Sequence, residues 1–321
     1  MEMFFSTLSQ MLMMFTLIAA GFVLRKCSIL PLDSDTGMAR AETFIFGPAL
    51  YIGTQMNQCT VEMFSENYTL IIYGLIITVS AIIVAYPMCR IFVRTKGANS
   101  DELYRQSVYK YALAFGNYGF MGNFIALTVF GEAFLNKYIL FTFFVGILCL
   151  TWGLFVLVPK DQGVSIWKNL KKGLLNPMTI GLLLGMVLGL LNVKEYVPAF
   201  LSTALTQAGA CQGPVAMILA GFVIGGYNLK ELLLDGKVYL ATLFRLILIP
   251  AVMLLVLKAL GAGEELMVLT LIAFGTPLGL NTIVFPAAYG GETKTGASMA
   301  MISHTLSVIT IPLMYLVFIV L

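Results

Sequence analysis

The feature that most constrains this chain is its series of long apolar runs, because each is close to the roughly 20 residues that a helix needs to cross a bilayer. Charged residues make up only 11% of the sequence and hydrophobic residues 59%, whereas a soluble domain carries about 25% charged residues. No stretch long enough for a separate soluble domain remains. We therefore predict one all-α polytopic membrane domain with ten spans at 4–24, 39–57, 68–92, 107–131, 134–158, 174–192, 197–226, 236–260, 265–290 and 296–321.

The basic residues predict how the spans are oriented. Of the 19 lysines and arginines, 16 lie in or beside the loops that follow spans 1, 3, 5, 7 and 9, and the others are Lys137, Lys194 and Lys258. Cytoplasmic loops are enriched in lysine and arginine. We therefore expect the odd-numbered loops in the cytoplasm and both termini on the other side of the cell (inner or plasma) membrane. The net charge of +3 follows from this bias and implies no nucleic-acid partner.

Other classes of protein are disfavoured by motifs that the sequence lacks. The first 26 residues have neither a positive leader nor a cleavage site, so they are expected to stay as the first span. The five cysteines are scattered without a C-x-x-C pair, which predicts no disulfide, metal site or cofactor. H-E-x-x-H and G-x-S-x-G are absent, and with a single histidine an enzyme is not expected.

Short matches between the two halves of the chain predict an internal repeat. Spans 2, 3 and 4 share features with spans 7, 8 and 9 at offsets of 159 to 166 residues. The matched pairs are Gly47-Pro48 and Gly213-Pro214, Pro87 and Pro250, Ala114–Gly116 and Ala273–Gly275, and Glu132 and Glu292. We predict two five-span halves, 1–160 and 161–321. Since five is odd, the second half is inverted, which is a signature of secondary transporters.

Spans 4 and 9 are predicted to be broken near the middle of the membrane. Span 4 contains Gly116, Gly119 and Gly122, and span 9 contains Pro277 between Gly275 and Gly279. Proline removes a backbone N–H and clashes with the preceding turn. Irregular backbone at this depth persists only where protein or a wet cavity satisfies it. Two matched breaks indicate a binding site, although glycines can also be close-packing sites, as we expect for "GLLLGMVLG" in span 6.

The polar residues at the breaks are the predicted substrate site. At the offset of 159, Asn117 aligns with Thr276 and Asn123 with Thr282, which Asn281 precedes. Asn123 and Thr282 are suited to N-capping a second half-helix. Because the N-terminus of a half-helix offers free N–H groups and a positive dipole end, we expect an anion such as a carboxylate to bind there.

Three further residues carry open alternatives. Tyr118 either faces the substrate or packs. His304 either exchanges a proton or donates to a carboxylate, or it is a neutral ring bonded to the neighbouring backbone or Ser303. Arg245 lies about 12 Å into span 8, where it either snorkels back to the interface or attracts an anion.

Two segments resemble the auxin efflux carrier family, whose plant members are the PIN proteins. The first runs through spans 9 and 10, "GTPLGLNTIVFPAAYGGETKTGASMAMISHTLSVITIPLMYLV". The second, "FGNYGFMGNFIALTVFG", is similar to the family's span 4 motif N-x-G-F-x-G-x-P at Asn117, Gly119, Phe120 and Gly122, without its proline. The loop at about 159–173 is short, as in prokaryotic members.

The resemblance implies a fold shared with bile-acid symporters and sodium/proton antiporters. Spans 1, 2, 6 and 7 would form a scaffold, often dimeric. Spans 3–5 and 8–10 would form an elevator-like transport domain in which helices 4 and 9 cross. It also implies small organic acids such as malonate, malate or auxin as substrates.

The expected function is a carrier that moves small organic anions by alternating access. No Asp or Glu is placed at the centre of a span, which disfavours the antiporter mechanism because a central carboxylate usually carries the coupled ion. The membrane potential would then drive the anion, at about 2.3 kcal/mol per charge per 100 mV. A sodium- or proton-coupled symporter on the same fold and an anion channel remain alternatives. The expected partners are the anion, membrane lipid and a second copy of the chain.

Overall fold

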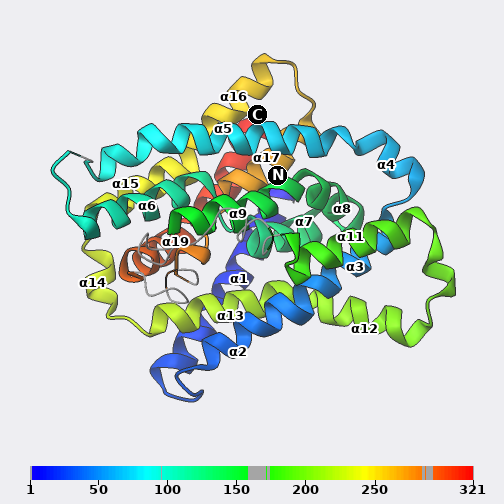
Figure 1. Ribbon diagram of the computed structural model, residues 1–321, viewed down its shortest axis with the longest axis horizontal. Helices are drawn as coiled ribbons and strands as arrows, with labels where there is room; N and C mark the ends of the chain where they lie inside the picture. Colours follow the sequence, from blue (N-terminus) through cyan, green and yellow to red (C-terminus); the bar gives the residue numbers. More distant parts are fainter. Residues whose placement is uncertain are drawn as a thin grey trace.

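The computed structural model describes residues 2–94, 96–157, 171, 174–283, 286 and 292–320, and these residues form helices joined by turns (Figure 1). Five helices are long and apolar enough to cross a membrane: 8–26, 69–92, 199–225, 236–259 and 294–320. Residues 132–141 and 143–157 form a further apolar pair bent by 50°, and 118–130 and 177–190 are shorter apolar helices. The all-α, multi-pass prediction is confirmed, while the count of ten spans and their inverted repeat stay predictions.

The first half of the chain contains eleven of the described helices. They are α1 (Glu2–Lys26), α2 (Ser34–Ala41), η1 (Glu42–Phe46), α3 (Gly47–Gln58), α4 (Val61–Asn67), α5 (Thr69–Phe92), α6 (Ser100–Ala114), η2 (Tyr118–Gly122), α7 (Asn123–Phe130), α8 (Glu132–Phe141) and α9 (Phe143–Leu157). Span 4 is thus divided into α6 and the η2–α7 helix, as predicted for a broken span.

The second half follows a similar course. Its helices are α11 (Pro177–Leu190), η4 (Val193–Tyr196), α12 (Ala199–Ala210), α13 (Gln212–Gly225), α14 (Leu229–Leu233), α15 (Gly236–Leu243), η5 (Phe244–Leu248), α16 (Ile249–Ala259), α17 (Glu264–Gly275), α19 (Lys294–Tyr315) and η6 (Leu316–Val320). The predicted loop 159–173, apart from Lys171, lies outside the described residues. So does the predicted second half of span 9 beyond Ile283, apart from Pro286 and Glu292.

Two wide π-helical turns each precede a proline. η1 ends two residues before Pro48, and η5 ends two residues before Pro250. A proline ring clashes with the carbonyl four residues earlier, and proline has no N–H to donate to it. A local π-turn accommodates the clash and the missing hydrogen bond without ending the helix. As a result α2, η1 and α3 form one unbroken helix over 34–58, which starts earlier than the predicted span 2.

Small residues set the closest helix contacts. α1 packs along α13, where Gly21 lies against the backbone of Ile218 and Gly221 against the backbone of Ile18. α11 packs along α3 in the same way, with Gly181, Gly185 and Gly189 against the backbone of that helix. A side chain at these positions would hold the helices apart. The prediction that "GLLLGMVLG" is a close-packing stripe is therefore confirmed.

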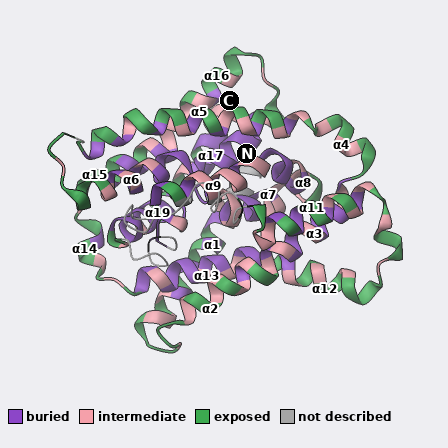
Figure 2. Cartoon of the chain, viewed as in Figure 1, coloured by how far each residue is buried: buried purple, intermediate pink, exposed green. Residues whose placement is uncertain are grey.

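The interior and the outer faces differ as expected for a protein in lipid. α17 is buried at every residue over 267–275, and it lies in the middle of the molecule in Figure 2. α5 runs along one long edge and exposes Ile72, Ile76 and Ile83. Such exposed apolar residues on a helix of this length and hydropathy are suited to contact with lipid tails.

Three ion pairs connect residues that lie beside two odd-numbered predicted loops or beside two even-numbered ones. Lys137, after span 4, forms a 2.6 Å ion pair with Glu265, after span 8. Arg105 at the start of span 4 pairs with Asp235 after span 7 at 2.5 Å, and Lys294 pairs with Glu231 at 2.6 Å. Loops that the alternation predicts on one side of the membrane therefore meet at one end of the structure.

Candidate functional site

The two broken spans meet backbone to backbone. α6 ends at Ala114 and α17 ends at Gly275, and the chain after each is extended. Gly116 forms an antiparallel β-bridge with Leu278, and the N–H of Asn117 donates to the carbonyl of Pro277 at 2.7 Å. Each break thus satisfies backbone groups of the other, which is the condition for irregular backbone inside a membrane.

The break in span 4 is shorter and lies earlier than its three glycines predict. It occupies residues 115–117, whereas Gly119 and Gly122 lie within the π-turn η2. Gly122 is needed there because a side chain would collide with the hydroxyl of Tyr138. In span 9, Gly275 is the last residue of α17, and Gly279 packs against the carbonyl of Gly116, with 3.0 Å between that oxygen and an ideal Cβ.

Gly116 and Gly119 provide a matched pair of substitutions. A Cβ at Gly116 would lie 2.5 Å from Nη2 of Arg245 and 2.7 Å from Oγ1 of Thr276, whereas a Cβ at Gly119 meets no atom within 4 Å. We expect Gly116→Ala to separate the breaks and destabilise the protein by about 1–3 kcal/mol, the usual effect of overpacking. Gly119→Ala should change stability by less than about 0.5 kcal/mol. Thermal unfolding of both purified variants in detergent measures this, and equal unfolding temperatures would contradict the crossing geometry.

Arg245 is fully buried beside the crossing. Its Nη1 donates to the carbonyls of Leu113 at 3.1 Å and Ala114 at 3.4 Å, and its Nη2 donates to the carbonyl of Ala273 at 3.4 Å. The guanidinium also lies 5.7 Å from the ring centre of Phe274. The snorkelling alternative is therefore wrong: the side chain extends inward, because the last turns of α6 and α17 leave carbonyls without helical partners.

This arrangement balances charge at the crossing. The C-terminal end of a helix carries about half a negative charge, and both α6 and α17 direct that end to Arg245. The two ends together offset roughly one positive charge. The charge of Arg245 is therefore offset by the ends of α6 and α17. The positive end of the η2–α7 helix, which starts at Tyr118, is left as the attractive end for an anion.

Asn117 and His304 form one polar pair of the site. Nδ1 of His304 lies 2.7 Å from the carbonyl oxygen of Ala300, and Nε2 lies 3.2 Å from Nδ2 of Asn117. A carbonyl oxygen only accepts, so Nδ1 carries the proton and Nε2 of the neutral ring accepts from the amide. The backbone bond agrees with the structural alternative for His304. The contact with Asn117 nevertheless places the ring at the first break, which spacing along the sequence does not reveal.

Ser303 is a site residue that the sequence analysis does not single out for the break. Its hydroxyl accepts from the N–H of Leu278 at 3.0 Å and lies 3.4 Å from the carbonyl of Ala300. It therefore ties α19 to the extended segment of span 9. Its place directly before His304 in the sequence is the available signal, and that signal becomes informative only once spans 9 and 10 are known to touch.

Asn281 and Tyr118 meet at the buried thiol of Cys149. Nδ2 of Asn281 lies 3.0 Å from the hydroxyl of Tyr111 and 3.2 Å from Sγ of Cys149. The Tyr111 hydroxyl lies 2.8 Å from the same sulfur, and the hydroxyl of Tyr118 also bonds it. This cluster joins a residue of each break through α9. Of the predicted polar residues, Asn281 and Tyr118 are only half-buried. We call these two residues the accessible edge of the crossing.

The other predicted residues are placed differently. Asn123 donates to the hydroxyl of Tyr51 in α3 at 3.3 Å, and it is the first residue of α7, without a capping bond. Thr276 and Thr282 donate to the backbone carbonyls of Ala273 at 3.4 Å and Gly279 at 2.9 Å. The N-cap prediction for Asn123 is wrong, because this residue has helical backbone angles inside the continuous η2–α7 helix. The N-cap prediction for Thr282 stays a prediction, because the backbone N–H groups of 284 and 285 lie outside the described residues. Among the described residues, Thr276 and Thr282 support the break of span 9.

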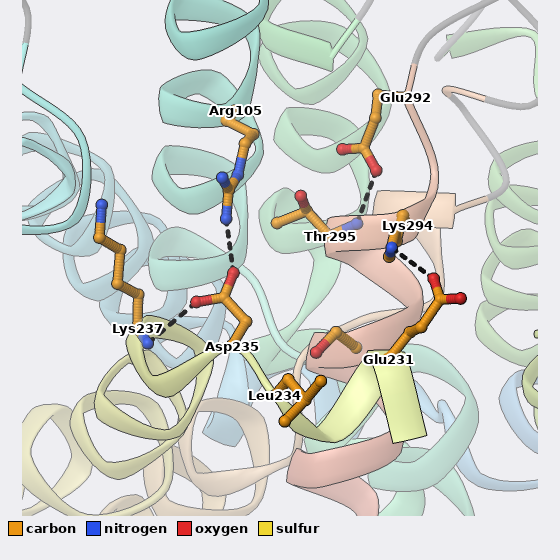
Figure 3. A pocket seen from close by; sticks show the side chains of 9 residues that line it. Arg105, Glu231, Leu234, Asp235, Lys237, Glu292, Lys294 and Thr295 are labelled. Carbon is orange, nitrogen blue, oxygen red and sulfur yellow. Dashed lines mark hydrogen bonds and ion pairs between the residues drawn. The ribbon is translucent and has the colours of Figure 1, made fainter. Parts of the chain in front are cut away.

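Two cavities lie away from the crossing residues. The first, of about 640 Å³, is polar and lined by Arg105, Glu231, Leu234, Asp235, Lys237, Glu292, Lys294, Thr295 and Ser298 (Figure 3). The ion pairs of Arg105 with Asp235 and of Lys294 with Glu231 cross it. The second, of about 380 Å³, is a mainly apolar pocket between α15, η5 and α19. Neither includes a residue of the predicted substrate site.

Comparison with known proteins gives the class of the chain. Residues 6–169 and 164–315 match the sequence model of a family described as membrane transport protein. A protein of Methanocaldococcus jannaschii, described as an uncharacterized transporter, is 28% identical to the chain over 207 residues. That match covers 62% of this chain and 64% of the relative, so it spans less than two-thirds of either protein.

Proposed function

Since this chain belongs to the membrane transport protein family, as the resemblance to auxin efflux carriers predicts, we propose that it is a carrier for small organic anions that works by alternating access. The observation that carries the proposal is the crossing itself. Two broken helices pair through Gly116 and Leu278, and a buried arginine offsets their C-terminal ends. Paired half-helices of this kind are how transporters hold substrates near the bilayer midplane.

The anion would bind at the accessible edge of the crossing. Tyr118 and Gly119 open the η2–α7 helix and are half-buried. The first N–H groups of a helix have no partner within it, so they can donate to a carboxylate together with the dipole end. Nδ2 of Asn281 donates to Tyr111 and Cys149 in this structure, and it would become a side-chain donor to the anion by exchanging one of these two bonds. The bond between Asn117 and His304 would hold Asn117 in place.

Two polar contacts connect the crossing to the proposed scaffold. Nε2 of Gln212 in α13 donates to the carbonyl of Gly119 at 3.2 Å, and Asn123 donates to Tyr51 in α3. Spans 2 and 7, which carry Tyr51 and Gln212, would stay fixed while the crossing slides past them. Neutral hydrogen bonds contribute only about 0.5–1.5 kcal/mol each, so exchanging these two bonds is compatible with movement. A homodimer through the scaffold completes the proposal.

Reconstitution into proteoliposomes tests the function. We expect uptake of a labelled mono- or dicarboxylate to saturate with concentration and to accelerate when unlabelled substrate is present on the opposite side. A purified-protein thermal-shift screen against mono- and dicarboxylates selects the substrate first, because a ligand that binds the native state raises its stability. Ohmic currents without saturation would indicate a channel instead.

Ion coupling is tested in the same vesicles. With a sealed membrane and a set potential, a uniporter of anions responds to voltage in proportion to the charge moved. Uptake that is unchanged when sodium is replaced by potassium excludes the sodium-coupled alternative. Dependence on a pH gradient at fixed potential would favour the proton-coupled alternative.

A further inference from the structure

Glu42 is an acidic side chain buried inside the helical bundle. It has no exposed surface, and among the described residues neither carboxyl oxygen has a hydrogen-bond partner. The backbone of Ala216 in α13 faces the carboxyl group, but the two do not form a bond of normal geometry. A buried polar group without a partner costs about 1–3 kcal/mol, so an unsatisfied carboxyl group in a native interior requires a reason.

The structure buries Glu42 completely, although this residue stands only a few positions into the predicted span 2. A span starting at residue 39 leaves Glu42 near the membrane surface, whereas the unbroken helix starts at Ser34. Glu42 is eight residues from that start, which corresponds to about 12 Å at 1.5 Å per residue. α2, directly before it, has no buried residue. The carboxyl group therefore lies just inside the point where this helix passes from an exposed to a buried environment.

Among the residues that the structure describes, no charged group offers Glu42 a permanent partner. The helices that pack against η1 are α11, α12 and α13, and their sequences contain no charged or titratable side chain. On its own helix the neighbouring groups are Asp35 and the exposed Arg40 on one side and Tyr51 on the other, and Tyr51 is bonded to Asn123. An ionisable residue kept inside a membrane protein without a partner is by default a functional candidate.

α13 connects Glu42 to the crossing. Ala216 lies one helical turn after Gln212, whose amide donates to the carbonyl of Gly119 in η2, directly after the first break. Gly213, between them, packs so closely on Phe124 of α7 that a side chain there would collide with the ring. A change of charge beside Ala216 therefore acts on the same helix that holds η2 and α7.

We propose that Glu42 is a proton-binding site of the scaffold whose loading sets the pH dependence of transport. Loading adds one proton to a carboxylate oxygen, removes one negative charge from the bundle and is reversed from the exposed side of α2. The proposal rests on the proposed carrier function for its link to transport, while proton binding itself does not.

The first experiment compares Glu42→Gln with wild-type protein in proteoliposomes over about pH 5 to 10. We expect the wild-type rate to change by about tenfold over one pH unit on one side of its midpoint, the limit for one linked proton. The Glu42→Gln rate should vary less than twofold over the same range. Glu62→Gln, which changes an exposed acid on α4, is the matched control and should keep the wild-type profile. A wild-type profile in Glu42→Gln, or a changed sodium dependence at fixed pH, would overturn the proposal.

The second experiment needs no transport. Infrared difference spectra of the purified protein should show a protonated-carboxyl band that titrates with pH and is missing in Glu42→Gln. Glu42→Asp should restore a titrating band, which covers the case in which the glutamine variant misfolds. A band that does not change with pH would show a permanently neutral side chain and overturn proton exchange. If the band titrates but no anion is transported, the carrier function fails and the proton site stands.

Discussion

Replacing Arg245 with alanine is expected to abolish transport and to lower the free energy of unfolding by about 3–5 kcal/mol, as removal of one partner from a buried charged contact does. The guanidinium bonds the carbonyls of Leu113, Ala114 and Ala273. Without it, the negative ends of α6 and α17 face each other in a buried site, and their carbonyls lose charged donors. The variant is measured by thermal unfolding in detergent and by uptake into proteoliposomes.

Lysine at the same position separates charge from geometry. Arg245→Lys keeps the charge but has a single ammonium in place of the planar fork, so it is expected to bond one helix end and to lose about half as much stability. Arg40→Ala, at an exposed position on α2, removes a charge of the same kind and should leave both measurements unchanged. Wild-type unfolding of Arg245→Ala would show that the arginine does not hold the crossing together.

Asn117→Ala and Asn281→Ala should each abolish saturable transport while the protein remains inserted and folded. Asn117 loses its bond to His304, and Asn281 loses its bonds to Tyr111 and Cys149. Leaving buried partners unsatisfied costs about 1–3 kcal/mol, which is small enough for both variants to be purified. Binding of the selected carboxylate should weaken at least tenfold, equivalent to about 1.4 kcal/mol, as measured by the thermal shift at increasing ligand concentration.

The two asparagines are expected to fail in different ways. Asn281 lies at the accessible edge and would touch the anion, so Asn281→Gln should recover binding in part through its longer amide. Asn117 is buried against His304 and would position the first break, so Asn117→Gln should not recover. Asn67→Ala on α4, whose amide bonds only the backbone of Met63 among the described residues, is the control. Normal kinetics in both alanine variants would reject the site.

The sequence predicts the broken helices because their cause is local. Proline and glycine act on the backbone where they stand, so Pro277 and Gly116 mark the crossing without any knowledge of packing. The predicted partners of these residues are less accurate. The N-cap role of Asn123 is wrong, since this side chain bonds a distant group, the hydroxyl of Tyr51, instead of the local backbone.

Arg245 and Glu42 show the limit of reasoning from one sequence. Both stand in π-turns before a proline. Counting residues from the nearest loop leaves two alternatives open for Arg245 and does not single out Glu42. Counting gives depth along a helix but not the direction of a side chain. The residues that receive Arg245 are 131 and 132 positions away for α6 and 28 away for α17, so their role emerges only when the helices are assembled.

The pairing of Gly116 with Leu278 also has a consequence for synthesis of the chain. When span 4 leaves the ribosome, its backbone partner is still about 160 residues from being translated, which is roughly ten to thirty seconds at 5–20 residues per second. During that interval residues 115–117 lack the strand-like neighbour that satisfies them in the finished protein. The first half therefore enters the membrane incomplete, and the crossing cannot form before span 9 has been synthesised.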